Sequence, residues 1–340
     1  MRNYYAMAVQ GRPAVLGSLK KLTASETKAT LALLPRVPFI TYQGRDSIRE
    51  KADSIDRWNF WCFALHLTSA VCLIALTLSN EQWPVYATIM HPDWKPCDGS
   101  LQSCSKVQCK ITMVSDVVGK VPLEWLVFAF HIMSVIAHAC NRWFFRETYY
   151  MWLCRKMNPG RWLEYFFSAS IMQTVIMVLT GFTDVWTLVL STVMIGVTQF
   201  FGHITEQVLY YSRYEPKPLA RLEKWQYYLY GWVSFIPPWV GVYYSFYWAI
   251  LNTKGDGPPD WVQAIVWTLI LAFSCFAGVM AWYIYNWDSK DVSFRAEKAY
   301  CFFSLLSKTI LTWQLYFGAF SRENRTNKII AYDPTNPGIC

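Results

Sequence analysis

The stretch SLLSKTILTWQ, from Ser304 to Gln314, places one lysine inside a run that is otherwise uncharged and largely apolar. That lysine, Lys308, lies nine residues into the run 299–320. At the rise of an α-helix this corresponds to a depth of roughly 13 Å in a bilayer. A charge at the middle of a membrane costs roughly 2.5–3.5 kcal/mol on insertion scales, so an ionisable group at such a depth is a candidate functional residue. The interpretation of Lys308 therefore depends on whether the chain spans a membrane.

The composition predicts a membrane protein. Of the 340 residues, 54% are hydrophobic and only 16% are charged, which is too apolar for a soluble protein of this length. Several runs reach the length of about 20 largely uncharged residues that a bilayer core requires. We place seven expected spans at residues 58–80, 122–141, 162–182, 186–211, 226–251, 261–286 and 299–320. We therefore expect an all-α membrane protein.

The distribution of lysine and arginine predicts the orientation of these spans. One side of the expected membrane carries 22 of the 31 Lys and Arg residues, the other side carries eight, and Lys308 is the remaining one. Because basic residues concentrate on the cytoplasmic side, we expect a cytoplasmic N-terminal tail at 1–57, a bundle at 58–320 and an extracellular C-terminal tail at 321–340. The net charge of +8 then reflects topology, and nucleic acid is not an expected partner.

The first extracellular connection, residues 81–121, is unusually long. It contains two segments rich in β-branched residues, WPVYATIM (83–90) and VQCKITMVSDVV (107–118), separated by Pro, Gly, Asp and Ser residues. This pattern predicts a β-hairpin. An isolated hairpin is only marginally stable, so this one is expected to lean on another surface, such as a partner subunit. An irregular loop held by a disulfide is the alternative.

Four cysteines fall on the expected extracellular side, where disulfides persist. They are Cys97, Cys104, Cys109 and Cys340. We favour a disulfide over a metal site because His91 is the only histidine near them. The sequence does not give their pairing.

A lysine buried in a membrane suggests two roles. Its amine can form a Schiff base with a carbonyl-bearing cofactor, or it can form an ion pair that only fixes helix packing. A cation at this site needs an anion, and Glu164 lies just inside the third span in RWLEYFFSASIM (161–172). Ser168 is one turn along the same face, and Ser304 is one turn before Lys308. Glu164 could instead stabilise the start of its helix through the helix dipole.

Three stretches resemble the heliorhodopsins, which are seven-helix retinal proteins with a topology inverted relative to other microbial rhodopsins. They are RWNFWCFALH (57–66), RWLEYFFSAS (161–170) and EKAYCFFSLLSKTILTWQ (297–314). The resemblance extends over all seven spans and implies a seven-transmembrane-helix rhodopsin bundle. The long N-terminal tail, the cysteine-bearing first extracellular loop and the C-terminal tail depart from the family pattern, which puts partners and regulation in doubt.

The resemblance implies that Lys308 binds all-trans-retinal covalently as a protonated Schiff base. Glu164 is then the matching counterion, with Ser304 and Ser168 beside the linkage. Other positions that match the wall of the retinal pocket are Tyr165, Met172, Pro238, Trp239, Phe273 and Trp313. We further expect a homodimer in the cell membrane, and the signalling partner is unknown.

Polar residues within the spans form helical stripes, and with the expected topology they lie in the cytoplasmic half only. His131 and His138 are seven residues apart on the second span, and His203 lies on the fourth. The candidates for proton transfer are Asn59, His66, His138 and Glu206. Among these, His66 and His138 match histidines of the family near the Schiff base, where an imidazole could accept its proton. The alternative is that each is a buried packing residue.

These features favour a light sensor that is neither a pump nor an enzyme. Outward pumps resemble one another in a second carboxylate on the third span, where this chain has Val175, and an aspartate four residues before the lysine, where it has Ser304. A light-gated proton channel or transporter is the alternative, because Glu206 is a second carboxylate within the membrane. A non-photochemical transporter or scaffold that uses Lys308 to bind an anion is a more distant alternative.

Overall fold

The structure is a computed structural model, and it describes residues 42–77, 83–93, 110–214, 219–252 and 260–320. The chain forms two units, Met1–Glu50 and Lys51–Cys340, and the second contains the helix bundle. The cysteines Cys97, Cys104, Cys109 and Cys340 lie outside the described residues, so their expected disulfides stay predictions.

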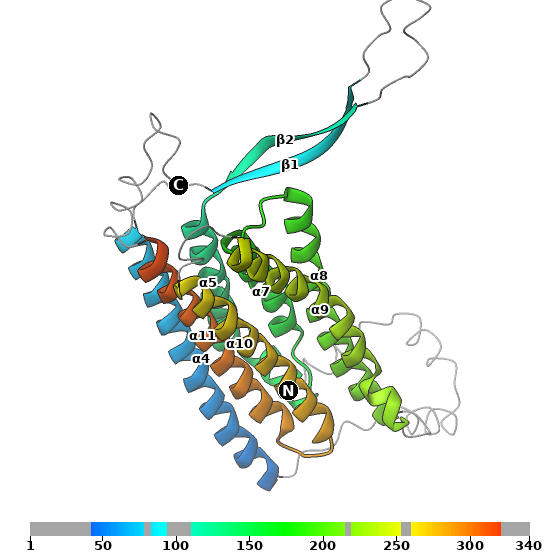
Figure 1. The fold of residues 1–340 in the computed structure, drawn as a ribbon. Helices are drawn as coiled ribbons and strands as arrows, with labels where there is room; N and C mark the ends of the chain where they lie inside the picture. Colours follow the sequence, from blue (N-terminus) through cyan, green and yellow to red (C-terminus); the bar gives the residue numbers. More distant parts are fainter. Residues whose placement is uncertain (1–41, 78–82, 94–109, 215–218, 253–259, 321–340) are drawn as a thin grey trace, which may run out of the picture. The chain divides into compact units, whose positions relative to one another are not determined.

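Helices account for most of the described residues, and the long ones run side by side in the bundle (Figure 1). Seven of the eight described α-helices are at least 17 residues long, whereas α6 has nine. In chain order they are α4 (Tyr42–Thr77), α5 (Leu123–Ala139), α6 (Arg146–Cys154), α7 (Pro159–Leu179), α8 (Val185–Tyr211), α9 (Arg221–Asn252), α10 (Asp260–Tyr285) and α11 (Val292–Leu315). Short π-helical turns at Cys140–Phe144 and Tyr316–Phe320 and a 3₁₀ turn at Ser212–Tyr214 extend three of them.

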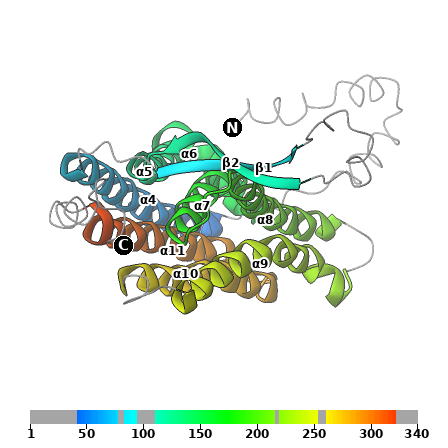
Figure 2. The same cartoon turned by 45° about the horizontal axis from the view of Figure 1, so that its top comes forward.

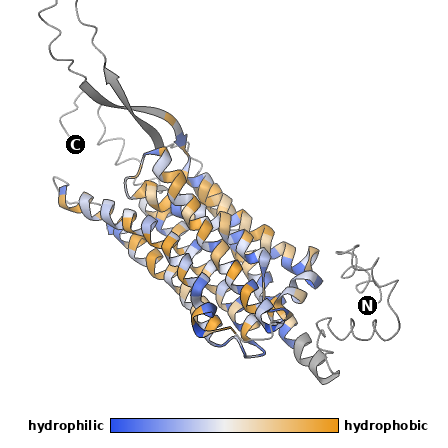
Figure 3. Ribbon diagram, turned by 90° about the vertical axis from the view of Figure 1, so that its right-hand side faces the viewer, coloured by the Kyte–Doolittle hydropathy of each residue, from blue (hydrophilic) through white to orange (hydrophobic). Residues whose placement is uncertain are grey.

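Five of the described helices are long and apolar enough to cross a membrane: the helical stretches Glu50–Thr77, Leu123–Phe144, Pro159–Leu179, Val185–Tyr214 and Asp260–Tyr285. Figure 3 shows hydrophobic residues along the length of the bundle. The helices α9 and α11 are long enough but less apolar, since α9 is rich in Tyr and Trp and α11 carries Arg295, Glu297, Lys298 and Lys308. The count of seven spans and their orientation therefore stay predictions.

Two strands form an antiparallel sheet in the connection between α4 and α5. Strand β1 (Trp83–Asp93) pairs with β2 (Lys110–Val121), from Trp83 opposite Val121 to Asp93 opposite Lys110 (Figure 2). The register shifts between Val85 and Tyr86. These are the segments in which the sequence predicts the arms of a hairpin, while residues 94–109 between them lie outside the described part of the chain.

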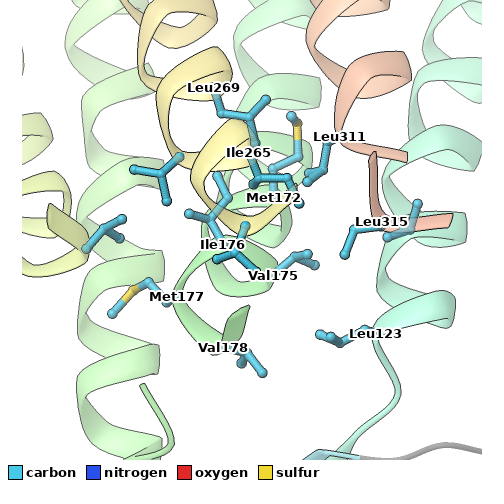
Figure 4. Close-up of a cluster of buried hydrophobic side chains, with 14 of the residues drawn as sticks. Leu123, Met172, Val175, Ile176, Met177, Val178, Ile265, Leu269, Leu311 and Leu315 are labelled. Atoms are coloured by element: carbon cyan, nitrogen blue, oxygen red, sulfur yellow. The ribbon is translucent and has the colours of Figure 1, made fainter. Parts of the chain in front are cut away.

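Two buried apolar clusters divide the bundle along its length. One includes Leu123 of α5, Val175 of α7 and Leu311 of α11 (Figure 4), and the other includes Tyr165 of α7 and Tyr300 of α11. Along α11, Lys308 lies between Tyr300 of the second cluster and Leu311 of the first. The buried lysine therefore lies between two apolar layers.

Close packing of α7 on α8 orients a tryptophan near the second cluster. Gly202 of α8 faces the ring of Trp162, and a Cβ at this position would overlap that ring. Small residues allow membrane helices to approach closely, because no side chain separates their backbones. In this arrangement Trp162 donates a hydrogen bond from Nε1 to Glu206 Oε2, at 2.8 Å.

Candidate functional site

Lys308 is held by an anion and two hydroxyl groups. Its Nζ donates to Glu164 Oε1 at 2.6 Å, to Ser134 Oγ at 2.6 Å and to Ser304 Oγ at 3.1 Å. The side chains of Lys308 and Glu164 are only 2% and 9% exposed. Since an ammonium group has three N–H donors, all of its hydrogen-bonding capacity is satisfied at this site.

Three helices contribute these partners. Ser304 lies one turn before Lys308 on α11, Ser134 lies on α5, and Glu164 lies in the second turn of α7. Glu164 does not cap α7: the capping side chain is that of Asn158, which accepts a hydrogen bond from Arg161 N at 3.1 Å. The alternative role of Glu164 at the helix start is therefore not supported.

Ser134 is a site residue that was not expected from the sequence. Its hydroxyl contacts both members of the ion pair, since it accepts from Lys308 and lies 2.7 Å from Glu164 Oε1. Its position between His131 and His138, about one turn from each, places it on the same face of α5 as these histidines. That polar stripe is the signal that could have identified it.

A cavity of about 100 Å³ opens beside Lys308, between α7, α8, α9, α10 and α11. Its wall is mainly apolar and aromatic with a few polar groups, as is typical of small-molecule sites. The expected site residues in its wall are Tyr165, Ser168, Met172, Phe273, Ser304 and Lys308. Large side chains in the wall that the sequence analysis did not single out are Trp162, Phe201, Tyr228, Trp232, Phe235, Phe276, Met280 and Tyr300.

Three expected wall residues do not line this cavity. Trp239 is buried behind the wall, with its ring centroid 5.4 Å from that of Phe273, and Pro238 precedes it on α9. Trp313 lines a separate hollow together with Trp261 and other residues of α10 and α11. The mismatch arises because helical position alone does not determine which face of a helix meets a cavity.

A chain of hydrogen bonds begins at His138 and leads toward the α6 end of the bundle. The amide Oδ1 of Asn59 lies 2.8 Å from His138 Nδ1, and its Nδ2 donates to Tyr149 Oη at 3.2 Å. Tyr149 in turn donates to Glu297 Oε1 at 3.0 Å. All four side chains are buried. The predicted candidates Asn59 and His138 are thus directly connected.

The chain ends in a buried group of two carboxylates and one guanidinium. Arg161 forms ion pairs with both Glu206 and Glu297. Asn158 donates to the same carboxylates, from its backbone N to Glu206 at 2.9 Å and from Nδ2 to Glu297 at 2.8 Å. Glu206, a candidate for proton transfer, is therefore paired with a cation.

Glu297 is a second residue of the network that was not expected from the sequence. It lies within the stretch 297–314 but just before the expected span 299–320, whereas α11 begins at Val292 and buries Glu297 to 2% exposure. A span boundary drawn from hydropathy leaves out charged residues at the ends of the span. Because α11 begins earlier than the expected span, Glu297 lies inside the bundle.

A second group of polar side chains connects three histidines. His66 Nδ1 lies 2.9 Å from His131 Nδ1, and His131 Nε2 lies 2.7 Å from Thr312 Oγ1. The rings of His66 and His138 stack, with centroids 5.8 Å apart. His203 is not part of this group and contacts Gln207 at 3.0 Å.

This group corrects one expectation. Polar residues were expected only on the side of Lys308 that leads to the cytoplasm. Thr312 lies one turn beyond Lys308, on the opposite side from Glu297, and is buried together with His131. Polar groups therefore extend past the lysine in both directions along α11.

The family comparison matches a heliorhodopsin model to residues 55–320, which include every element of the site. The chain belongs to the heliorhodopsin family. It is thus an integral membrane protein and a retinal-binding, light-sensing rhodopsin. No curated protein matches this heliorhodopsin by sequence.

A similar solved structure is that of the transmembrane domain of the Salpingoeca rosetta rhodopsin phosphodiesterase. The TM-score is 0.50 at 8% sequence identity, and the match covers 82% of this heliorhodopsin and 90% of the other chain. At this identity the likeness shows the fold alone, and it concerns only a transmembrane domain.

The residues of the site fit retinal. A polyene needs an apolar cavity, and the aromatic wall provides one whose lining includes an amine able to react with an aldehyde. Ser168 lines the same cavity, and its hydroxyl interacts with the Glu164 carboxylate. Lys308 would hold the cofactor, and Glu164 would compensate the charge at the attachment point.

Replacement of Arg161 tests the buried carboxylate group. Arg161→Leu leaves Glu206 and Glu297 without their cation, and removal of one partner from a buried ion pair costs about 3–5 kcal/mol. We expect a clear fall in the thermal unfolding temperature of the purified protein. Arg155→Leu, at an exposed arginine nearby, is the matched control. Equal unfolding temperatures for the two variants would contradict the structural role of Arg161.

Proposed function

We propose that this heliorhodopsin is a light sensor in which Lys308 carries all-trans-retinal covalently. After light absorption, the proton on Lys308 Nζ passes to polar groups that lead toward the α6 end of the bundle. The observation that carries the proposal is the position of Lys308 Nζ. It lies between an aromatic cavity and the acceptor group of Glu164, Ser134 and Ser304. A reacting amine is thus exposed to the cavity on one side and charge-compensated on the other.

When bound, retinal supplies absorption of visible light, isomerisation of a double bond and the aldehyde carbon that joins Nζ. The chain supplies the remaining functions. Glu164 stabilises the positive charge at Nζ, and Ser134 fixes the carboxylate by its contact at 2.7 Å. Tyr165 and Phe273 exclude water from the cavity and restrict movement along it.

Transfer of the proton from Nζ needs an acceptor within hydrogen-bond reach, directly or through one water. The imidazoles of His66 and His138 are buried, and each lies close enough to Lys308 to interact with its charge. From His138 the hydrogen bonds continue through Asn59 and Tyr149 to Glu297. Because Glu206 and Glu297 share the single cation of Arg161, the group retains a net negative charge when both are ionised. This charge favours movement of a proton toward α6.

The expected topology gives the side of the membrane toward which this proton would move. The excess of basic residues on the α6 side supports a cytoplasmic location for that end, with the protein in the cell membrane. The strands β1 and β2 form a sheet of only two strands, which a second copy could cover, consistent with a homodimer. The sensor would then transmit its signal through the cytoplasmic end of the bundle.

A light-gated proton channel or transporter is the second candidate. It is favoured by the polar groups that extend past Lys308 on the other side, His131 and Thr312. Two carboxylates at the α6 end, Glu206 and Glu297, could provide the exit of such a pathway. Apolar residues around Leu123 and Leu315 separate Thr312 from the β-sheet end, which favours the sensor.

The counterion role of Glu164 is tested by Glu164→Gln. With retinal added, wild-type protein should absorb in the visible, and the variant's remaining protonated form should absorb at longer wavelength because the ground-state charge is no longer held at Nζ. Absorption spectra of purified protein measure this. Asp288→Asn, at an exposed carboxylate, should leave the band in place, and Lys308→Ala should abolish it. An unshifted band in Glu164→Gln would reject Glu164, and a visible band in Lys308→Ala would reject the attachment site.

The acceptor role of the histidines is tested by the double variant His66→Ala, His138→Ala. Loss of both imidazoles should change, by several-fold, the yield or lifetime of the light-induced state in which Nζ has lost its proton. Flash photolysis over a pH series measures this change. His203→Ala, at a histidine outside the connected group, is the control. Kinetics equal to those of wild type at every pH would remove His66 and His138 from the mechanism.

A further inference from the structure

The hydrogen bonds around His131 determine where the protons of two histidines lie. Thr312 Oγ1 donates to the backbone oxygen of Lys308 at 2.7 Å. Since a hydroxyl group has a single proton, Thr312 must accept the hydrogen bond that joins it to His131 Nε2 at 2.7 Å. His131 therefore carries a proton on Nε2.

The position of the proton on His131 also determines which nitrogen of His66 is protonated. A neutral imidazole with a proton on Nε2 is an acceptor at Nδ1, so His131 Nδ1 accepts the bond from His66 Nδ1 at 2.9 Å. His66 then carries its proton on Nδ1 and has a bare Nε2. This Nε2 is buried and has no hydrogen-bond partner among the described residues. It is an unoccupied proton acceptor in the interior of the bundle.

The opposite arrangement of protons is less favourable. If Thr312 donated to His131 Nε2, the proton of His131 would lie on Nδ1 and that of His66 on Nε2. His66 would then bury an N–H donor without a partner, and the hydroxyl would no longer donate to Lys308 O. Buried N–H groups without partners are rarer in proteins than under-satisfied acceptors. The hydrogen-bond geometry therefore favours the first arrangement.

An independent set of contacts gives His138 the same tautomer as His66. Asn59 Nδ2 donates to Ile55 O at 3.1 Å and to Tyr149 Oη at 3.2 Å, so the nitrogen of this amide is the group that faces those acceptors. Its Oδ1 consequently accepts from His138 Nδ1 at 2.8 Å. His138 thus also carries its proton on Nδ1, and the two stacked rings both keep Nε2 bare.

We propose that His131 and Thr312 are positioning residues that hold His66 in the tautomer with a bare Nε2, so that this atom can accept the proton released from Lys308 Nζ. This inference rests on the proposed function and adds residues to it. Ser134, which accepts from Nζ, lies one turn from His131 on α5. His131 therefore shares the face of α5 that meets Nζ. Neither His131 nor Thr312 itself receives the proton.

The tautomers can be measured directly in the dark by nitrogen-15 NMR of protein labelled at histidine. Spectra of retinal-free and retinal-loaded protein would be recorded, with signals assigned by His66→Asn and His131→Asn. In wild-type protein we expect the proton of His66 on Nδ1 and that of His131 on Nε2. A wild-type His66 that carries its proton on Nε2 would overturn the proposal.

A pair of variants at Thr312 separates positioning from packing. Thr312→Val preserves the shape of the side chain but removes the acceptor for His131 Nε2–H. The Nδ1–H signal of His66 should then weaken and an Nε2–H signal should appear, whereas Thr312→Ser should retain the wild-type pattern. An unchanged His66 signal in Thr312→Val would show that Thr312 only packs against the ring, and the proposal would fail.

This experiment is independent of the proposed function, because it needs neither light nor proton transfer. The tautomer pattern can hold even if the light-driven kinetics are insensitive to His66 and His138, in which case the proposed acceptor role fails but the positioning of His66 stands. If the kinetics depend on these histidines while the tautomer does not depend on Thr312, only the positioning role is contradicted.

Discussion

The ion pair between Lys308 Nζ and Glu164 is the interaction on which the rest of the structure depends. Two charges buried in a bundle are costly to desolvate, and their attraction compensates that cost only when the remaining hydrogen-bonding groups are also satisfied. Ser134 and Ser304 satisfy them here, one from α5 and one from α11. Electrostatic contacts to one nitrogen atom therefore hold three helices together. The apolar clusters on either side of Lys308 along α11 lower the local dielectric constant, which strengthens the attraction.

Pairing of buried polar groups also organises the α6 end. Arg161 forms ion pairs with two carboxylates, and Asn158, Tyr149 and Trp162 donate to the oxygens that remain. Polar groups joined in a network restrain one another, and they also provide a connected series of groups that can exchange protons. In this heliorhodopsin the series begins beside the retinal site at His138 and ends at Glu297. In the proposed mechanism, light sensing is the coupling of a charge change at Nζ to this network, which reaches the end of the bundle.

The sequence predicts the residues whose spacing or depth is unusual. Lys308 stands out because it interrupts an apolar run, and Ser304 follows from helical spacing. Ser134 and Glu297 could not be predicted as readily, because their roles depend on which helices become neighbours and on where α11 begins. Likewise, Trp313 lies at a plausible depth but on a face that meets a different hollow. Periodicity gives the face of one helix, whereas a site built from α5, α7 and α11 requires the packing of all three.

The most direct test of the central claim is a photocurrent measurement in cells that contain the retinal-loaded protein, recorded over a series of voltages and external pH values. In the proposed mechanism a proton leaves Lys308 and stays within the polar groups that include His66 and the network from His138 to Glu297, so that charge moves inside the protein without crossing it. The predicted result is a transient current at the onset of light and no stationary current at any voltage. A stationary current whose reversal potential follows the proton gradient would contradict the sensor and support a proton pathway through the membrane.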